Sequence, residues 1–213
     1  MTQSRRMGVE GSQMRGRFID AAEALLRDEG LLGLTARQVA SRAGLKTQLL
    51  YYYFRTMDDL ILALVRRVND RRLERFHEIM ASPNPLRRLW ELNTDASGAV
   101  MSSELSSIAS HREAIRAEIV RFAQQFRALQ VDAVGRLLSD RQGVEGSAAG
   151  IVMIAVALAR AIVTESALGL TEGHREALDI VEHMLGRLEV SVPVSPTEYG
   201  PPKSGTPALS NHG

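Results

Sequence analysis

The stretch from Leu34 to Phe54, LTARQVASRAGLKTQLLYYYF, decides the fold. Thr35 precedes a short helical run and Gly44 follows it. A threonine N-cap and a glycine that takes the left-handed conformation are typical ends of an α-helix. The apolar positions of this run are Val39, Ala40 and Ala43. A second short helical run, Thr47 to Phe54, begins directly after Leu45 and Lys46. Two short helices joined by a glycine-containing turn form the helix-turn-helix arrangement.

The polar residues of this stretch lie where docking onto duplex DNA needs them. The second helix of such a pair can enter the major groove with its first turn facing base edges. Glutamine pairs with adenine and arginine with guanine, while tyrosine hydroxyls bond phosphate. Three consecutive tyrosines exceed what one small core holds, so we expect one to pack inside. The candidate DNA contacts are Thr35, Arg37, Gln38, Lys46, Thr47, Gln48, Tyr51, Tyr52 and Tyr53. Spacing alone leaves open that the two helices are only a structural pair in an all-α protein.

The charge distribution favours a local site for a polyanion. The chain has a net charge of +1, yet residues 1–56 hold nine Lys/Arg and five Asp/Glu. A basic N-terminal quarter on a balanced body is typical of local polyanion binding. Arginine outnumbers lysine by 24 to 2. Arginine suits forked contacts to phosphate or guanine, although a GC-rich genome gives the same bias.

Helical periodicity extends over the rest of the 213 residues. We count eight or nine helices and no strand, which predicts an all-α fold. Thr56 and Asp59 form a capping box before a long helix towards Met80, and Asn84-Pro85 opens another. The segment Thr94–Ser110 holds six serines and reads as a broken helix or a loop. The predicted organisation is a flexible basic arm (1–14), a three-helix DNA-binding domain (15–57), a helical body (58–190) and a Pro-rich disordered tail (191–213).

Residues 15–62 resemble the DNA-binding domain of TetR-family transcriptional regulators. The resemblance rests on Ala21-Ala22, Leu25, Gly30, Leu34-Thr35, Val39-Ala40, Ala43-Gly44-Leu45, Leu50-Tyr51-Tyr52-Tyr53-Phe54 and Leu60. It implies that Thr35 contacts phosphate, that Arg37, Thr47 and Gln48 fall at base-reading positions, and that Tyr51 and Tyr52 lie beside the DNA backbone. The chain departs from the family pattern at two positions. Met57 stands where the family often has a phosphate-contacting lysine, and Gln48 stands where it often has a small residue.

The resemblance also implies that the body forms a homodimer and binds a small molecule. The segment 147–168 is too apolar for the surface of a monomer, and with 172–188 it could form half of an intermolecular four-helix bundle. A core helix within one subunit would have the same composition. An apolar effector would bind among the helices from 58 to 140. Candidate pocket residues are Trp90, Asn93, Met101, Glu104, His111, Phe122, Gln125 and Phe126. For the aromatic residues, an ordinary core position is the alternative.

The sequence argues against several other classes. It has no cysteine, its five histidines show no metal-ligand spacing, and it holds no nucleophile, phosphate-loop or dinucleotide motif. We therefore expect no enzyme activity, no metal and no cofactor. The N-terminus does not resemble a secretory signal, and Arg160 ends the most apolar stretch short of a membrane span, which predicts a cytoplasmic protein. The expected function is a transcriptional repressor released from a near-palindromic operator by an effector. The alternatives are a ligand-independent regulator and an all-α enzyme or carrier.

Overall fold

The computed structural model describes residues 2–139 and 146–189, so the predicted tail at 191–213 lies outside the described residues. These two ranges contain nine α-helices and no strand, which confirms the all-α class. The helices are α1 (Thr2–Gly33), α2 (Ala36–Ala43), α3 (Thr47–Tyr53), α4 (Met57–Met80), α5 (Pro85–Thr94), α6 (Ala96–Ala109), α7 (Glu113–Leu138), α8 (Ala148–Ala167) and α9 (His174–Glu189).

The local signals in the helix-turn-helix segment give the structure that they predicted. The Thr35 hydroxyl accepts a hydrogen bond from the Gln38 N–H and caps α2. Gly44 has φ 65° and ψ 35°, and its N–H bonds the last carbonyls of α2. This left-handed conformation costs glycine little because it lacks a Cβ. Thr56 and Asp59 form the predicted capping box at the start of α4. The Thr56 hydroxyl accepts a hydrogen bond from the Asp59 N–H, and the Asp59 carboxylate accepts one from the Thr56 N–H. These four residues fix where α2 begins and ends and where α4 begins.

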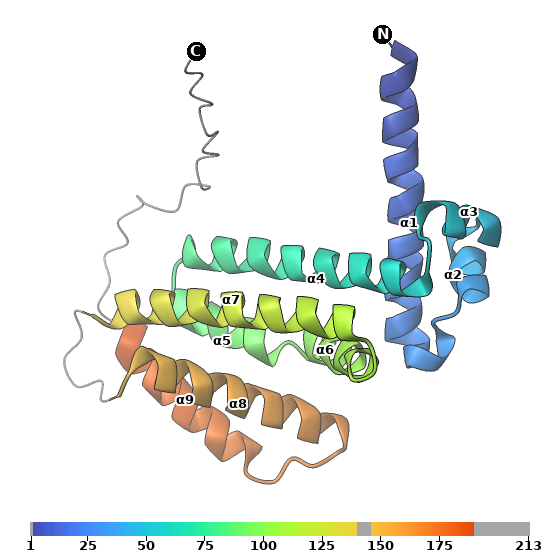
Figure 1. The fold of residues 1–213 in the computed structure, drawn as a ribbon. Helices are drawn as coiled ribbons and strands as arrows, with labels where there is room; N and C mark the ends of the chain where they lie inside the picture. The colour runs from blue at the N-terminus through green and yellow to red at the C-terminus, as the bar shows by residue number, and fades with distance from the viewer. Residues whose placement is uncertain (1, 140–145, 190–213) are drawn as a thin grey trace, which may run out of the picture.

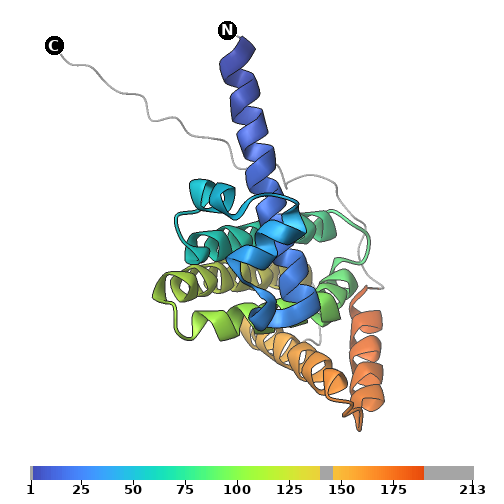
Figure 2. The ribbon, with the colours of Figure 1, turned by 90° about the vertical axis from the view of Figure 1, so that its right-hand side faces the viewer.

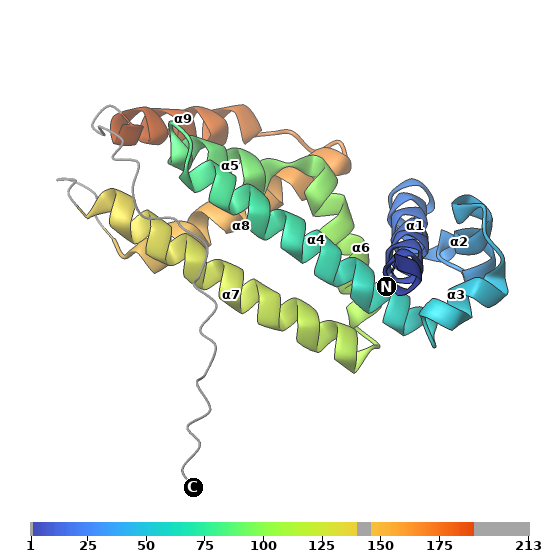
Figure 3. The same cartoon turned by 90° about the horizontal axis from the view of Figure 1, so that it is seen from above.

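The helices α1, α2 and α3 form a head at one end of the molecule, and α4 runs from the head along the body (Figure 1). Seen from above, α4 and α7 extend away from the head on the same side of it (Figure 3). Viewed from the head end, α8 and α9 lie on the opposite side of the body from the N-terminus of α1 (Figure 2). The head is thus carried by α4 at the end of a helical body.

Helix α1 differs from the prediction at its start. We expected an arm without regular structure over residues 1–14, but α1 begins at Thr2 and continues through this segment. A methyl group at Gly11 would lie 3.8 Å from the Tyr53 hydroxyl, so this part of α1 passes close to α3. Near its C-terminal end, α1 is kinked. Gly30 has φ 66° and ψ −164°, a conformation that is essentially restricted to glycine.

One hydrophobic core joins the head to the body. It contains Phe18 and Leu50 of the head, Leu64 of α4, and residues of α6 and α7. Phe18, Leu50 and Leu64 have no exposed surface, and each fully buried side chain of this size contributes about 1.5–3 kcal/mol. Ion pairs between Asp20 and Arg67 and between Glu23 and Arg71 reinforce the α1–α4 contact. Packing therefore crosses the predicted boundary at residue 57.

A second core holds the far end of the body together. It is formed by α4, α5, α7, α8 and α9, and it includes Phe76, Trp90, Phe126 and Ala159. Helix α8 is long and apolar enough to cross a membrane by length and composition, with a mean hydropathy of 1.9, although we expected Arg160 to make the apolar stretch too short. One such helix is weak evidence for a membrane span. Only 11% of its most apolar window is buried, so α8 presents apolar surface outwards.

Two details of the body differ from the expectations. Asn84 precedes α5 and Pro85 is its first residue, but the Asn84 side chain makes no capping hydrogen bond and its backbone has φ 56°. The serine-rich segment is neither broken nor a loop. Asp95 accepts a hydrogen bond from the Ser97 N–H and starts α6, which continues to Ala109. Burial of Met101, Leu105 and Ile108 in the shared core stabilises this helix despite its serines.

The kink at Gly30 generates a stability prediction. Gly30→Ala forces a residue with a Cβ into a glycine-only conformation and should reduce the free energy of unfolding by about 1–3 kcal/mol. The nearest atoms to such a Cβ are Glu104 carboxylate oxygens at 3.6 Å, an ordinary contact, so the expected loss is conformational. Urea denaturation followed by circular dichroism measures the change.

Gly16→Ala is the matched control. Gly16 lies inside the same helix, and a Cβ there would be 3.7 Å from an Arg67 nitrogen. This substitution should be neutral or should stabilise by up to about 1 kcal/mol because alanine favours the helix. Equal effects of the two substitutions would show that the kink carries no conformational strain for other residues.

Candidate nucleic-acid interface

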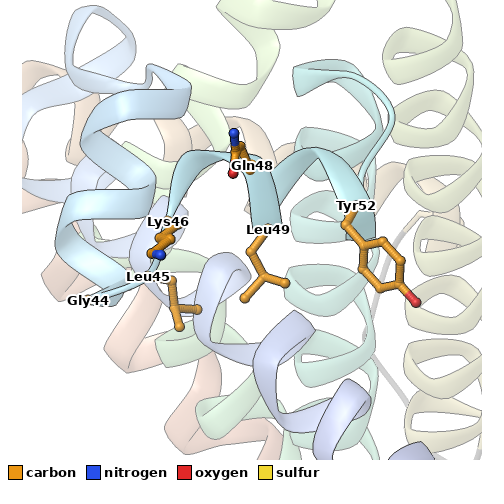
Figure 4. A pocket seen from close by; sticks show the side chains of 6 residues that line it. All are labelled: Gly44, Leu45, Lys46, Gln48, Leu49 and Tyr52. Carbon is orange, nitrogen blue, oxygen red and sulfur yellow. The ribbon is translucent and has the colours of Figure 1, made fainter.

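The first turn of α3 is open to solvent and forms one wall of a hollow in the surface. The hollow has a volume of about 660 Å³ and is lined by Gly44, Leu45, Lys46, Gln48, Leu49 and Tyr52. Figure 4 shows Gln48 pointing away from Leu45 and Leu49. Lys46 and Gln48 are exposed, whereas the two leucines are partly buried against the shared core. The packing of the two leucines thus holds the first turn of α3 in place, while Lys46 and Gln48 remain accessible to a ligand.

Thr35 and Gln38 already bond to each other and to their surroundings. The Thr35 hydroxyl donates to the Gln38 Oε1 at 2.7 Å, and the Gln38 Nε2 lies 3.4 Å from a Glu29 oxygen. Both side chains are exposed. The Thr35 hydroxyl has one proton to donate. To donate it to a phosphate, Thr35 must break its hydrogen bond to Gln38. Arg37 projects from the same first turn of α2, is exposed, and forms no ion pair within the described residues.

The three tyrosines divide as we expected. Tyr51 is 50% exposed and Tyr52 is 78% exposed. Tyr53 is partly buried, with its ring centroid 6.3 Å from that of Phe18 and 5.1 Å from that of Tyr52. Tyr53 is therefore the tyrosine that packs inside, although the sequence placed it among the DNA contacts. Tyr51 and Tyr52 keep their hydroxyls accessible beside Gln48.

Much of the basic charge of the head holds the head together. Arg17 donates to the Ala43 carbonyl at 2.6 Å, and Arg42 bridges Asp28 and Glu29. The hydrogen bond to Asp28 raises the pKa of the Arg42 guanidinium above its ordinary value. Arg55, which sequence reasoning did not select, is exposed between α3 and α4 and has no ion pair within the described chain. The exposed cations of the described head that form no ion pair thus include Arg15, which lies over the Phe54 ring, together with Arg37, Lys46 and Arg55.

The body contains a second hollow, a cleft of about 580 Å³ lined mainly by α4, α5, α6, α7 and α8. Four of the predicted pocket residues line it, and they are Asn93, Met101, Phe122 and Phe126. The Phe122 and Phe126 rings stack with centroids 5.5 Å apart. Both phenylalanines also belong to or pack against the second core, so they serve as core and as cleft wall together.

The other four predicted pocket residues do not line this cleft. Trp90 is 9% exposed and packs in the second core, as the alternative held for it. His111 and Gln125 are exposed, at the α6–α7 turn and on α7. Glu104 lies at the joint with the head, where its Oε2 accepts a hydrogen bond from the Leu31 N–H at 3.1 Å. The sequence suggested these residues from their side-chain chemistry, which does not specify which helix each one faces.

The sequence analysis missed several polar residues of the cleft, and three of them matter most here. Asn69 and Arg72 of α4 and Gln130 of α7 line it. The Asn93 Oδ1 accepts from the Arg72 Nη2 at 3.1 Å and from the Gln130 Nε2 at 3.3 Å. The signal for the α4 pair was present, because Asn69 and Arg72 fall at helical spacing between buried Val65 and Phe76. Polar residues on an apolar stripe mark a cleft or a polar network.

The Glu104 contact predicts a local effect on the head. Glu104→Ala removes the side-chain acceptor of the Leu31 N–H. Hydrogen exchange at this amide should accelerate about fivefold, because a hydrogen bond of this kind contributes on the order of 1 kcal/mol. Exchange measured by NMR checks this, with Glu113→Ala on exposed α7 as the control. An unchanged rate at Leu31 would contradict the contact.

The comparisons with known proteins bear on the head first. Residues 18–64 match the family described as bacterial regulatory proteins, tetR family. The HTH-type transcriptional repressor KstR2 of Mycobacterium tuberculosis is 31% identical over 88 residues, which is 41% of this chain and 44% of the relative. An uncharacterized HTH-type transcriptional regulator in the dhlA 5′ region of Xanthobacter autotrophicus is 37% identical over 79 residues, 37% of each chain. The chain thus spans less than half the length of the curated relatives it matches.

Solved structures extend the likeness to the whole fold. A putative TetR-family transcriptional regulator from Rhodococcus sp. aligns with a TM-score of 0.62 and 21% identity, over 84% of this chain and 98% of that one. Reduced NemR of Escherichia coli aligns with a TM-score of 0.68 and 18% identity, over 80% and 97%. At these identities the structures show the fold alone. The head of the chain is thus similar to the tetR family of bacterial regulatory proteins, and the chain shares the all-α fold of these solved structures.

Proposed function

We propose that the protein is a cytoplasmic, homodimeric transcriptional repressor that binds a near-palindromic operator and leaves it when a small molecule occupies the body. The observation that carries the DNA-binding part is the exposed first turn of α3. It holds Lys46 and Gln48 on a turn fixed by Gly44 and Leu50, within the segment that matches the family. Arg37 and Arg55 add unpaired positive charge beside it.

The unpartnered apolar surface of α8 and α9 supports a dimer. Met153 and Ile154 of α8 and Ile180 and Met184 of α9 are 54–70% exposed. Exposed apolar residues gathered on two neighbouring helices are typical of a subunit interface. Pairing these helices across a two-fold axis would give a four-helix bundle. A dimer of this kind requires the two recognition helices to reach major grooves about 34 Å apart.

The cleft in the body favours control by a ligand over a ligand-independent regulator. Its volume falls in the usual range of small-molecule sites, about 300–1,000 Å³. Met101 and Leu105 line the cleft and also belong to the core shared with the head. A ligand that packs best when these side chains shift would bind the DNA-free state more tightly, which release requires. The matches to transcriptional regulators count against the enzyme or carrier alternative.

The direct test is footprinting of the purified protein on its own upstream intergenic DNA at two salt concentrations. The proposal expects protection of a near-palindrome that weakens steeply with salt, because phosphate contacts release counterions. Selection from a random DNA pool covers the case of a distant operator. Failure of both experiments to yield a specific site would contradict DNA recognition by this head.

Two head variants separate base reading from phosphate contact. Gln48→Ala should cost about 1–3 kcal/mol on the selected site and little on random DNA, because its amide reads a base edge. Thr35→Ala should weaken both DNAs to a similar extent. Electrophoretic mobility shifts with the two DNAs measure the difference. Equal losses on both DNAs for Gln48→Ala would refute the base contact.

A charge on α8 tests the dimer. Ile154→Glu places a carboxylate on the exposed apolar face and should convert the dimer to a monomer, because burying an unpaired charge is costly. Operator affinity should then fall about tenfold or more through loss of the second half-site. Sedimentation and mobility shifts measure the two effects. Val120→Glu on α7, at a residue 47% exposed, is the control and should remain dimeric.

A further inference from the structure

The cleft in the body contains a partly buried cation that no carboxylate of the described chain neutralises by an ion pair. Arg72 projects from α4, with its guanidinium carbon 5.0 Å from the centre of the Phe126 ring. Within the described residues, its one hydrogen bond goes to the neutral Asn93. Asp95, whose charge reaches Arg72, forms its ion pair with Arg75 at 3.8 Å. Burial lowers the pKa of the Arg72 guanidinium, so the charge is held in a poorly solvated place.

A guanidinium in this position has donors to spare. It carries five N–H groups, and Asn93 accepts from one nitrogen. Asn93 in turn is fixed by Gln130, which is 2% exposed. This network from α4, α5 and α7 orients Arg72 without neutralising it. Because desolvating an unpaired charge costs free energy, an anion that enters the cleft would recover that cost.

Asn69 provides a second hydrogen-bond donor close to Arg72. The Asn69 Nδ2 is buried and has no hydrogen-bond partner in the described structure. Asn69 and Arg72 are three residues apart on α4, so their side chains lie on the same face of the helix. A buried amide nitrogen without a partner costs on the order of 1–3 kcal/mol, which an acceptor from a ligand would relieve. Together, the two residues offer a charged and a neutral donor to the same small region.

The rest of the cleft offers an apolar wall. Met101, Leu105, Ile119, Phe122 and Val156 line it from α6, α7 and α8. The carboxylates of Glu74 and Glu78 also line the cleft, but both residues are exposed on α4. Glu23 at the same edge is paired with Arg27 and Arg71. Asp95 also lines the cleft, and its charge acts on Arg72 while it pairs with Arg75. The glutamates thus lie at the exposed side, while Arg72 packs over the Phe126 ring and the Asn69 Nδ2 is buried.

We propose that this cleft binds an amphipathic carboxylic acid. Its carboxylate accepts hydrogen bonds from Arg72 and Asn69, and its hydrocarbon part lies against the apolar wall with Phe122. One guanidinium fork and one amide suit the two oxygens of a carboxylate. For its regulatory consequence the inference rests on the proposed function, since the acid would be the effector that releases DNA. Binding itself is tested without DNA.

The experiment uses the full chain and two matched probes, decanoate and 1-decanol, below their aggregation limits. Trp90 is the only tryptophan and lies one helical turn from Asn93, so its fluorescence reports binding. Decanoate should bind about tenfold more tightly than 1-decanol, because a charge-assisted hydrogen bond is strong in a dry site. Simple hydrophobic binding would favour the alcohol. Decanoate binding that is equal to or weaker than that of 1-decanol overturns the proposal. So does the absence of decanoate binding at about 1 mM, the limit of a weak ligand.

Arg72→Gln assigns the effect to the cleft. It should weaken decanoate about tenfold and leave 1-decanol within twofold, and the retained 1-decanol binding shows that the variant is folded. Arg88→Gln is the control, because Arg88 is exposed on α5 and does not line the cleft. Equal decanoate affinity in the wild-type protein and Arg72→Gln overturns the proposal. If the protein binds operator DNA but shows no preference for decanoate, only this inference is refuted. If it binds decanoate but no DNA, the proposed function is refuted.

Discussion

A single hydrophobic core crosses from the helix-turn-helix into the body, and the position of the head depends on it. Phe18 of α1 and Leu50 of α3 belong to the same core as Leu64 of α4 and Leu105 of α6. Interiors are packed at the density of organic crystals, so such a core does not deform continuously. A change at one of its edges must be taken up by a shift of a whole element. The head is therefore coupled to the body by packing as well as by the chain connection at α4.

The cleft lies on the other side of that core. Val65, Met101 and Leu105 are core residues towards the head and lining residues towards the cleft. Within α6, Glu104 accepts a hydrogen bond from the Leu31 N–H next to Gly30. Arg112 and Asp58 join the α6–α7 turn to the start of α4 at 3.0 Å. A ligand in the cleft thus faces α4 and α6, both of which contact α1 of the head.

The sequence predicted what local signals determine. Thr35, Gly44 and the pair Thr56 and Asp59 defined the ends of α2 and α4, because caps and left-handed glycines act within one turn. The serine-rich segment misled the prediction, since the burial of Met101 and Leu105 outweighs the weak helix propensity of serine. Similarly, the expected arm at 1–14 was judged from composition alone, whereas α1 runs through it.

The candidate site was harder to read than the fold. The exposed turn of α3 follows from its own sequence, so Lys46 and Gln48 could be selected directly. The cleft is assembled from helices far apart in the chain, and Asn93 meets Arg72 and Gln130 across 21 and 37 residues. Helical phase shows that Arg72 lies on an apolar stripe, but only the tertiary structure shows which residues face it. Glu104 was predicted as a pocket residue, but it faces the head instead, at Leu31, 73 residues away.

The distance between the two heads of a dimer tests the central claim, that cleft and head share one packing unit. The chain has no cysteine, so Leu32→Cys, at a residue 93% exposed on the head, allows one spin label per subunit. Pulsed electron paramagnetic resonance measures the distance between the labels on the two subunits. It should give one distance with the selected DNA and a different distance with decanoate in the cleft. The same distance distribution in both states, with decanoate shown to be bound, would contradict coupling between cleft and head.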